Sequence, residues 1–246
     1  MTRLVVVGDE QEGGETAAEI IAARIAARPD TVLGIATGST PLTTWAALAQ
    51  RGLDLSRTRA FALDEYLGLP PGHPQSFEAV VAREVTSTLG LDPDLVRVPA
   101  AHDEDPDAVA ERFERSIIDA GGVDVQVLGI GRNGHLAFNE PGTPLDAPTH
   151  VAALSADTRS DNARFFDTPS EVPTHAITQG LGTISRARTL LLLAFGSRKA
   201  PALAAAVEGP VSASLPASVI RRHPDAIVIA DVNAAAMIAK PASTRR

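Results

Sequence analysis

The stretch LGIGRNGHLAFNEPG, residues 128–142, holds the densest group of side chains able to do chemistry. It follows an apolar run and brings an imidazole, His135, and a carboxylate, Glu140, onto a segment that a proline closes. Five residues of turning chain can fold the carboxylate back onto one ring nitrogen, which leaves the other nitrogen for acid–base work. The spacing is not that of a HExxH zinc motif, and we expect no metal. A histidine that only satisfies loop backbone groups is the alternative.

A second candidate for proton transfer lies in ALDEYLGLP, residues 62–70. Asp64 and Glu65 stand there at the end of an apolar run. A carboxylate that is partly shielded from water can have its pKa raised toward the working pH and act as a base. Taken alone, the motif is more typical of a solvated carboxylate in a turn.

The segment TGSTP, residues 37–41, offers a site for a phosphate group. Gly38 lets the backbone approach a ligand, and Ser39 and Thr40 supply hydroxyl and N–H groups where a helix begins. An ordinary helix cap explains the same residues. Neither a Walker loop nor a dinucleotide fingerprint is present, because no GxxxxGK[ST] occurs and no long helix is expected after GIGRNG.

Two basic residues are further candidates for binding an anion. Arg164 lies in the polar segment SADTRSDNARFF, which can act as a mobile lid, although Arg159 in the same segment is an equal candidate by spacing. Lys199 stands out because lysine occurs at only two of the 22 basic positions. Lysine supplies a compact point charge where arginine supplies a planar fork. An exposed helix and a neutral surface position are the respective alternatives.

These candidates follow apolar runs that alternate with helical patterns. The runs at 3–8, 31–36, 59–63, 123–130, 189–195 and 226–231 predict strands, and helices are expected at about 15–28, from 41, at 77–89, 106–120 and 198–207, and after 231. Continuous apolar strands are typical of a parallel sheet that helices cover on both faces. We therefore expect a doubly wound, Rossmann-like α/β fold, in one domain over residues 1–240 with a short tail at 241–246. In such folds ligands bind beyond the carboxyl ends of the strands, where all the candidates lie.

Composition restricts the class of protein further. A net charge of −8 and a pI of about 5.2 disfavour nucleic acid and anionic membranes as partners. The absence of cysteine excludes disulfides and thiolate chemistry. No apolar run approaches the roughly 20 residues of a membrane span, and the apolar start is too short for a secretory signal, so a cytoplasmic protein is expected.

Taken together, the motifs resemble a known family. TGSTPLTTWAAL, FALDEYLGLPPGHPQSF, LGIGRNGHLAFNEPGTP, DTRSDNARFF and GSRKAPALAAAVEGPV occur in this order over most of the chain. The chain resembles the glucosamine-6-phosphate deaminases, which belong to a larger group that includes 6-phosphogluconolactonases. The lactonase branch ranks second, because it would carry a serine-leucine-phenylalanine-proline run in place of AFNEP. A non-catalytic sugar-phosphate sensor on the same fold is the third possibility.

The resemblance implies a substrate and a role for each candidate. The substrate would be an amino sugar phosphate, converted to fructose 6-phosphate and ammonia in amino sugar catabolism with no cofactor and no metal. Asp64 would move the C2 proton to C1, and His135, oriented by Glu140, would assist ring opening. The residues implied to hold the phosphate are Gly38, Ser39, Thr40, Arg164 and Lys199.

Two departures from the family pattern carry predictions. Asn133 stands where the best-known members have an aspartate before the GH, so we expect a lower pKa for the His135 ring and a shifted pH–rate profile. His150 and Ala152 stand where allosteric members have basic residues. We therefore expect little activation by N-acetylglucosamine 6-phosphate. A homo-oligomer is possible.

Overall fold

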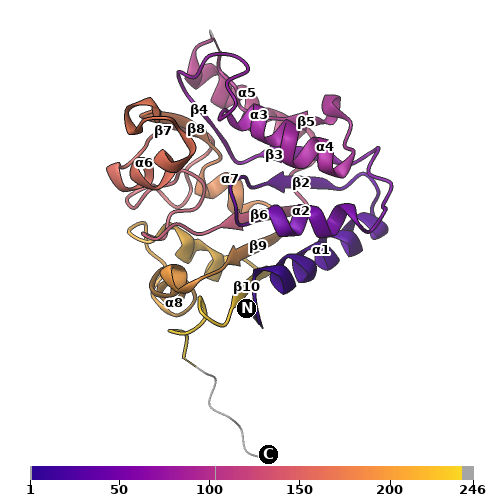
Figure 1. Ribbon diagram of the computed structural model, residues 1–246, viewed down its shortest axis with the longest axis vertical. Coiled ribbons are helices and arrows are strands. Elements are labelled where there is room, and N and C mark those ends of the chain that lie inside the picture. Colours follow the sequence, from indigo (N-terminus) through magenta and orange to yellow (C-terminus); the bar gives the residue numbers. More distant parts are fainter. Residues whose placement is uncertain (1, 103, 240–246) are drawn as a thin grey trace, which may run out of the picture.

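A seven-stranded parallel sheet forms the centre of the protein (Figure 1), whose computed structural model describes residues 2–102 and 104–239. Its strands, in spatial order, are β1 (Arg3–Val7), β10 (Ala226–Asp231), β9 (Thr189–Ala194), β6 (Val125–Gly129), β2 (Val32–Ile35), β3 (Arg59–Ala62) and β5 (Val96–Arg97). Every neighbouring pair is parallel. The middle strands β9 and β10 are buried along their whole length, which explains their uninterrupted apolar sequences. The predicted fold class is confirmed; the predicted tail, 241–246, lies outside the described residues.

Helices cover both faces of this sheet. The α-helices are α1 (Glu10–Ala27), α2 (Leu42–Ala49), α3 (Phe77–Val81), α4 (Ser87–Leu89), α5 (Pro106–Asp119), α6 (Ala156–Asn162), α7 (Leu181–Ser185) and α8 (Ala200–Glu208). A π-helical turn, η1 (Ala82–Thr86), joins α3 to α4, and 3₁₀ turns occur at η2 (Pro93–Leu95), η3 (Ala163–Phe165), η4 (Pro169–Glu171), η5 (Ser197–Lys199) and η6 (Pro216–Arg222). In Figure 1, α1, α2 and α4 lie together over one face. Right-handed crossovers place α5, α7 and α8 on the other.

Helix α1 begins five residues before the predicted start at residue 15. Asp9 caps it by accepting a hydrogen bond from the Glu12 N–H at 2.9 Å. The prediction missed this turn because it contains Gly13 and Gly14, which disfavour helix. A Cβ on Gly13 would lie 2.4 Å from the Phe195 ring, and one on Gly14 equally close to Thr43. The glycines therefore allow close packing of α1 against its neighbours.

A second, smaller sheet was not predicted. It is antiparallel, with the order β4 (Asp64–Tyr66), β8 (His175–Thr178) and β7 (His150–Ala153). The segment DEY is therefore a strand and not the loop expected after the apolar run at 59–63. Because β4 follows β3 after one residue, this sheet stands at the carboxyl ends of the large sheet, next to α6 (Figure 1).

Residues 232–239 do not form the helix expected after residue 231, and residues 232–237 form turns. The Asp231 carboxylate accepts hydrogen bonds from the N–H groups of Ala234 and Gly196, so it anchors the turns to the loop after β9. No helix of the described residues is long and apolar enough to cross a membrane.

The chain changes direction across the sheet between β2 and β6. From β2 it continues outward to β3 and β5, whereas from β6 it continues the other way to β9 and β10. Such a switch point leaves a crevice beyond the carboxyl ends of the two strands, which is where ligands bind in open α/β sheets. The loops TGSTP and GRNGH are the ones that leave β2 and β6 there.

Candidate active site

A cavity of about 710 Å³ opens at this switch point. Seven of the nine predicted site residues line it: Gly38, Ser39, Thr40, Asp64, His135, Arg164 and Lys199. The other two, Asn133 and Glu140, do not line the cavity but contact the segment that carries His135. Loops far apart in the sequence thus converge on one space, as the motifs predicted.

Asp64 and Glu65 are adjacent on β4 and both buried, and burial raises the pKa of each, but their hydrogen bonds differ. Glu65 accepts hydrogen bonds from the N–H groups of Tyr66, Phe77 and Glu78 at 2.7–2.9 Å, and so fixes the start of α3 against β4. Asp64 faces the cavity, and no donor of a described residue holds its carboxylate. Burial, reinforced by the charge of Glu65, raises the pKa of Asp64 to about 8. Asp64 therefore has the unpaired, shielded carboxylate that a proton-transfer base requires.

Aromatic side chains provide the shielding. Six of the chain's nine aromatic residues line the cavity: Tyr66, Phe77, Phe138, Phe165, Phe166 and Phe195. Tyr66 is central among them, with ring centroids 4.7 Å from Phe77, 5.5 Å from Phe138 and 5.8 Å from Phe166. Burial also raises the pKa of the Tyr66 hydroxyl, so Tyr66 stays neutral beside Asp64. The cavity is apolar on this side.

His135 lies against Gly131 in the loop after β6. A Cβ on Gly131 would lie 2.3 Å from the ring, so this position must be glycine for the imidazole to fit. The Nδ1 atom is buried without a hydrogen-bond partner among the described residues, which leaves Nε2 as the nitrogen available to the cavity. Burial lowers the pKa of His135, although the charge of Glu140 opposes this. A neutral imidazole of this kind can accept or donate a proton.

Glu140 makes hydrogen bonds to the start of α6 and none to the His135 ring. Its Oε1 accepts hydrogen bonds from the hydroxyls of Ser155, at 2.9 Å, and Thr158, both at the start of α6. Its Oε2 lies 3.9 Å from His135 Nδ1, too far for a hydrogen bond. Glu140 thus folds back to ion-pair distance of the ring, as expected, but makes no hydrogen bond to it. The carboxylate acts on the imidazole through its charge alone, because stronger donors occupy it. Burial raises its pKa, but these hydrogen bonds outweigh burial and keep the pKa below its ordinary value.

Asn133 connects Glu140 to the backbone of His135. Its Nδ2 donates to Glu140 Oε2 at 2.8 Å, and its Oδ1 accepts from the His135 N–H at 3.1 Å. These two bonds fix the orientation of the amide. A carboxylate at position 133 would face that of Glu140 across the same short distance. The amide of Asn133 therefore suits the Glu140 carboxylate, because it can donate a hydrogen bond where an ionised carboxylate could not.

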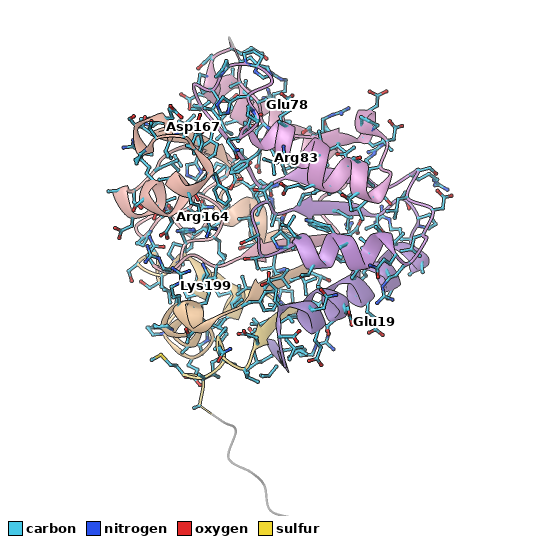
Figure 2. The ribbon with its side chains drawn as sticks, viewed as in Figure 1. Glu19, Glu78, Arg83, Arg164, Asp167 and Lys199 are labelled. Carbon is cyan, nitrogen blue, oxygen red and sulfur yellow. The ribbon has the colours of Figure 1, made fainter. Side chains whose placement is uncertain are left out.

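Cationic groups gather at the other end of the cavity. Lys199 donates from Nζ to the Ile130 carbonyl at 2.7 Å, and Arg132, Arg164 and Arg198 also line the space. Burial, with the repulsion of these arginines, lowers the pKa of Lys199, while Asp161 opposes the shift. Figure 2 shows Arg164 and Lys199 on the same side of the molecule; Arg164 lies in η3, directly after α6, and Lys199 in η5, directly before α8. Arg159, the alternative to Arg164 for binding an anion, lies in α6. It donates to the Val172 carbonyl and does not line the cavity.

Two helix N-termini complete this end. Gly38, with a φ of 85°, allows the tight turn after β2, and α2 follows with Pro41 as its N-cap. Gly196, also at 85°, turns the chain after β9 into Lys199 and α8. Free N–H groups at helix starts favour an anion, and a nearby ammonium adds to the effect. The arrangement fits a phosphate group.

Several residues of the site were missed by the sequence prediction. Arg132, Asp161, Asn162 and the aromatic residues line the cavity, and Ser155 and Thr158 hold Glu140. One signal was available, since a chain so poor in aromatic residues places Phe165 and Phe166 next to the predicted Arg164. Within residues 2–102 and 104–239, no three acidic or histidine side chains are arranged to hold a metal ion.

The fold and the cavity together define an α/β protein whose cavity has cationic groups at one end and a buried carboxylate at the other. Comparison with known proteins identifies the family. The family model described as "Glucosamine-6-phosphate isomerases/6-phosphogluconolactonase" matches residues 10–229. Two proteins named glucosamine-6-phosphate deaminase are similar in sequence. That of Bifidobacterium longum strain NCC 2705 is 49% identical over 97% of this chain and 93% of its own, and that of Cutibacterium acnes 51% identical over 96% and 92%.

Solved structures extend the comparison. A monomeric glucosamine-6-phosphate deaminase is 36% identical with a TM-score of 0.93, and the match covers 96% of this chain and 99% of that one. A 6-phosphogluconolactonase from Trypanosoma brucei is 21% identical with a TM-score of 0.77 over 97% and 99%, a likeness of fold alone. The chain belongs to the glucosamine-6-phosphate isomerase/6-phosphogluconolactonase family.

Proposed function

We propose that this protein converts glucosamine 6-phosphate and water to fructose 6-phosphate and ammonia. The observation that carries the proposal is the placement of an unpaired, buried Asp64 in one cavity with His135 and a cationic anion site. The deaminases that are about half identical in sequence support the same reaction. The AFNEP segment is intact, in contrast to the run expected in a lactonase.

The phosphate group is bound at the cationic end. The N–H groups and hydroxyls of Ser39 and Thr40, the turn at Gly38, Lys199 and Arg164 hold it there. This leaves the sugar ring directed toward Asp64 and the aromatic wall. Binding of the phosphate, which does not react, thereby orients C1 and C2 of the sugar, which do.

His135 opens the ring. Its Nε2 takes the proton of the C1 hydroxyl while the bond between C1 and the ring oxygen breaks, and the proton is then delivered to that oxygen. The products of this step are a C1 aldehyde and a C5 hydroxyl, with no net change in charge. The lowered pKa of the imidazole keeps it neutral and ready to accept the proton near pH 7.

Asp64 then carries out the isomerisation. Its carboxylate removes the proton from C2, which the neighbouring aldehyde makes acidic. The C2 ammonium gives one of its protons to the C1 oxygen, so a neutral enolamine with a hydroxyl on C1 forms. Return of the proton to C1 gives a C1 hydroxymethyl group and an iminium at C2. Water adds to the iminium and ammonia leaves, which yields the ketose.

The raised pKa of Asp64 has a consequence for this step. In the free enzyme the carboxylate must lose its proton before it can act, so kcat/KM rises with pH up to about 8. The substrate carries an ammonium group at C2, and a cation beside Asp64 favours the ionised form. The acidic limb of kcat therefore lies at lower pH than that of kcat/KM.

The test is to incubate the purified protein with glucosamine 6-phosphate and, separately, with 6-phosphogluconolactone. We expect ammonia and fructose 6-phosphate from the first and no acid release from the second beyond the spontaneous rate. Acid release from the lactone alone would establish the lactonase activity instead. Binding of both compounds without turnover would identify a sensor.

Regulation and assembly follow from the same proposal. Because His150 and Ala152 replace the basic residues of the allosteric members, we expect hyperbolic saturation that N-acetylglucosamine 6-phosphate leaves unchanged. A sigmoidal curve that the effector makes hyperbolic would contradict this. A homo-oligomer stays a prediction for sedimentation to decide; the solved relative with 36% identity is described as monomeric.

A further inference from the structure

One segment covers the cavity from outside the large sheet, and it carries Arg164. This lid segment consists of residues 155–166, which span α6 and η3. Its residues that line the cavity are Thr158, Asp161, Asn162, Arg164, Phe165 and Phe166. Since the phosphate-binding arginine lies near the C-terminal end of the segment, the position of that end decides whether Arg164 reaches the anion.

The start of the lid segment is fixed by Glu140. Ser155 and Thr158 donate to its carboxylate, and Ser155 also caps α6 by accepting the Thr158 N–H at 3.1 Å. These bonds act at the first turn of the helix. Arg164 lies more than a turn beyond them, so its placement needs a second attachment.

A forked ion pair supplies the attachment near that end. Arg132, in the loop after β6, donates from Nε to Asp161 Oδ2 at 2.9 Å and from Nη2 to Asp161 Oδ1 at 2.5 Å. The two parallel bonds fix both distance and orientation. In the part of the chain that the structure describes, this is the one ion pair that the lid segment makes. It joins the lid, three residues before Arg164, to the loop that carries His135.

Asp161 also has a second possible effect, of opposite sign. It lies among the cations of the anion site, because its charge acts on both Lys199 and His135. If it served only to neutralise them, it would repel an incoming phosphate and its removal would strengthen binding. If it serves to hold the lid, its removal would weaken binding. The sign of one measured change therefore separates the two roles.

We propose that Arg132 and Asp161 are positioning residues, whose ion pair holds the lid segment in place so that Arg164 binds the substrate phosphate. The forked geometry favours this role, since a carboxylate that merely tuned the field would not need two aligned bonds. The nature of the full ligand rests on the proposed function, but the effect on the phosphate group does not. Both side chains are about half exposed, at 48% and 44%, so the pair can break and re-form as substrate enters and product leaves.

The test compares Asp161→Asn, which keeps the side-chain size, with Arg132→Gln, which keeps a shorter polar side chain; each removes one charge. Calorimetry with inorganic phosphate gives a dissociation constant without any turnover, and steady-state kinetics gives KM and kcat for glucosamine 6-phosphate. We expect each variant to weaken phosphate binding and to raise KM by about fivefold, the upper range for an exposed ion pair, with kcat nearly unchanged. The double variant should be no worse than either single one, because both changes remove the same contact.

Two further variants complete the design. Exchanging the partners, as Arg132→Asp with Asp161→Arg, should recover part of the lost affinity. Glu111→Gln breaks the exposed pair with Arg115 on α5, which is distant from the cavity lining, and should change neither constant. Tighter phosphate binding by Asp161→Asn, or no change, would overturn the proposal. A wild-type protein that releases no ammonia would refute the proposed function, while the phosphate measurement would still decide the role of the ion pair.

Discussion

The two ends of the cavity use charge in different ways. At the anion end, Lys199, Arg132, Arg164 and Arg198 lie near helix N-termini, and Asp161 pairs with one of them. At the other end, a single carboxylate, Asp64, is buried beside aromatic rings and has no donor among the described residues. At the first end the charges are partly exposed to solvent and an opposite charge lies beside them. At the second end the carboxylate is buried, and no cation in the described part of the chain lies beside it.

The difference teaches how one site separates binding from chemistry. A phosphate dianion needs opposing charges and N–H groups, which still attract it in partial contact with water. A base that removes a carbon-bound proton needs a high pKa, and burial without a partner provides one. Changes at the anion end should therefore act mainly on KM, and changes at Asp64 mainly on kcat.

Asp64→Asn should have the largest effect. The amide keeps the shape of the carboxylate but cannot accept the C2 proton, so we expect kcat to fall by about 10³-fold or more, within the range for general-base catalysis. The affinity for inorganic phosphate should remain within about twofold of wild type, because the anion end is untouched. Steady-state kinetics and calorimetry on the same preparation measure both. Loss of phosphate affinity would show that the two ends are not separate.

The same substitution should stabilise the fold at neutral pH. The pKa of Asp64 is raised from an ordinary 3.8 to about 8, so the folded state retains a proton that the unfolded chain releases. Wild-type stability is therefore lost as pH rises from about 4 to about 8, at about 1.4 kcal/mol for each pKa unit. Denaturant unfolding should show Asp64→Asn to be more stable than wild type by a few kcal/mol at pH 8, with the difference vanishing near pH 4.

Glu65→Gln is the matched control for that stability measurement. Glu65 is the neighbour whose carboxylate accepts three backbone N–H groups, and an amide leaves some of them without an acceptor. We expect a loss of about 2 kcal/mol at neutral pH. A gain in stability from both substitutions would mean that burial of the Glu65 charge, which raises its pKa, outweighs its three hydrogen bonds.

Lys199→Ala should show the opposite kinetic pattern. Removal of a charged donor from a phosphate site costs about 1.5 to 3 kcal/mol, so KM should rise by about 10- to 100-fold with a much smaller change in kcat. Lys199→Arg is the control, because it retains the charge but replaces the compact ammonium that donates to the Ile130 carbonyl with a planar fork. A fall in kcat at saturating substrate, with KM unchanged, would place Lys199 in the chemistry.

Asn133→Asp should have the smallest effect on the reaction rate, and it tests how position 133 influences the pKa of His135. The new carboxylate would face Glu140 at the 2.8 Å now bridged by a hydrogen bond, so one of the two would bind a proton more tightly. Added negative charge near His135 raises the pKa of the imidazole. We expect the pH–rate profile to shift to higher pH by about one unit or less, an amount typical of one added neighbouring charge. An unchanged rate and profile would show that position 133 does not act on the ring.

Much of this site could be predicted from the sequence because its residues follow strands. Asp64, His135 and Lys199 each lie just beyond an apolar run, and in a parallel sheet those ends meet at one edge. The motif order then fixed the family. Prediction of six of the seven strands of the large sheet and of most helices succeeded for the same reason, since buried strands and amphipathic helices have distinct periods, whereas the two-residue edge strand β5 was not predicted.

What the sequence did not reveal depends on contacts across the fold. The small sheet pairs β4 with β8, which lie more than a hundred residues apart. The local sequences DEY and HAIT contain no pattern that predicts this pairing. The start of α1 was not predicted because Gly13 and Gly14 disfavour helix, and their role is to allow close packing against Phe195 and Thr43. The spacing brought Glu140 near His135 correctly, but it could not show that Ser155 and Thr158 donate the hydrogen bonds to its carboxylate.

Hydrogen exchange at C2 of the sugar tests the base directly. In deuterated water, wild-type protein should release fructose 6-phosphate with deuterium at C1, because the proton taken from C2 exchanges with solvent on the carboxyl of Asp64 before some turnovers are completed. The substrate recovered from Asp64→Asn should keep its C2 hydrogen, as proton magnetic resonance would show, although the variant still binds phosphate. Loss of that hydrogen at the wild-type rate in Asp64→Asn would contradict the assignment of Asp64 as the group that moves it.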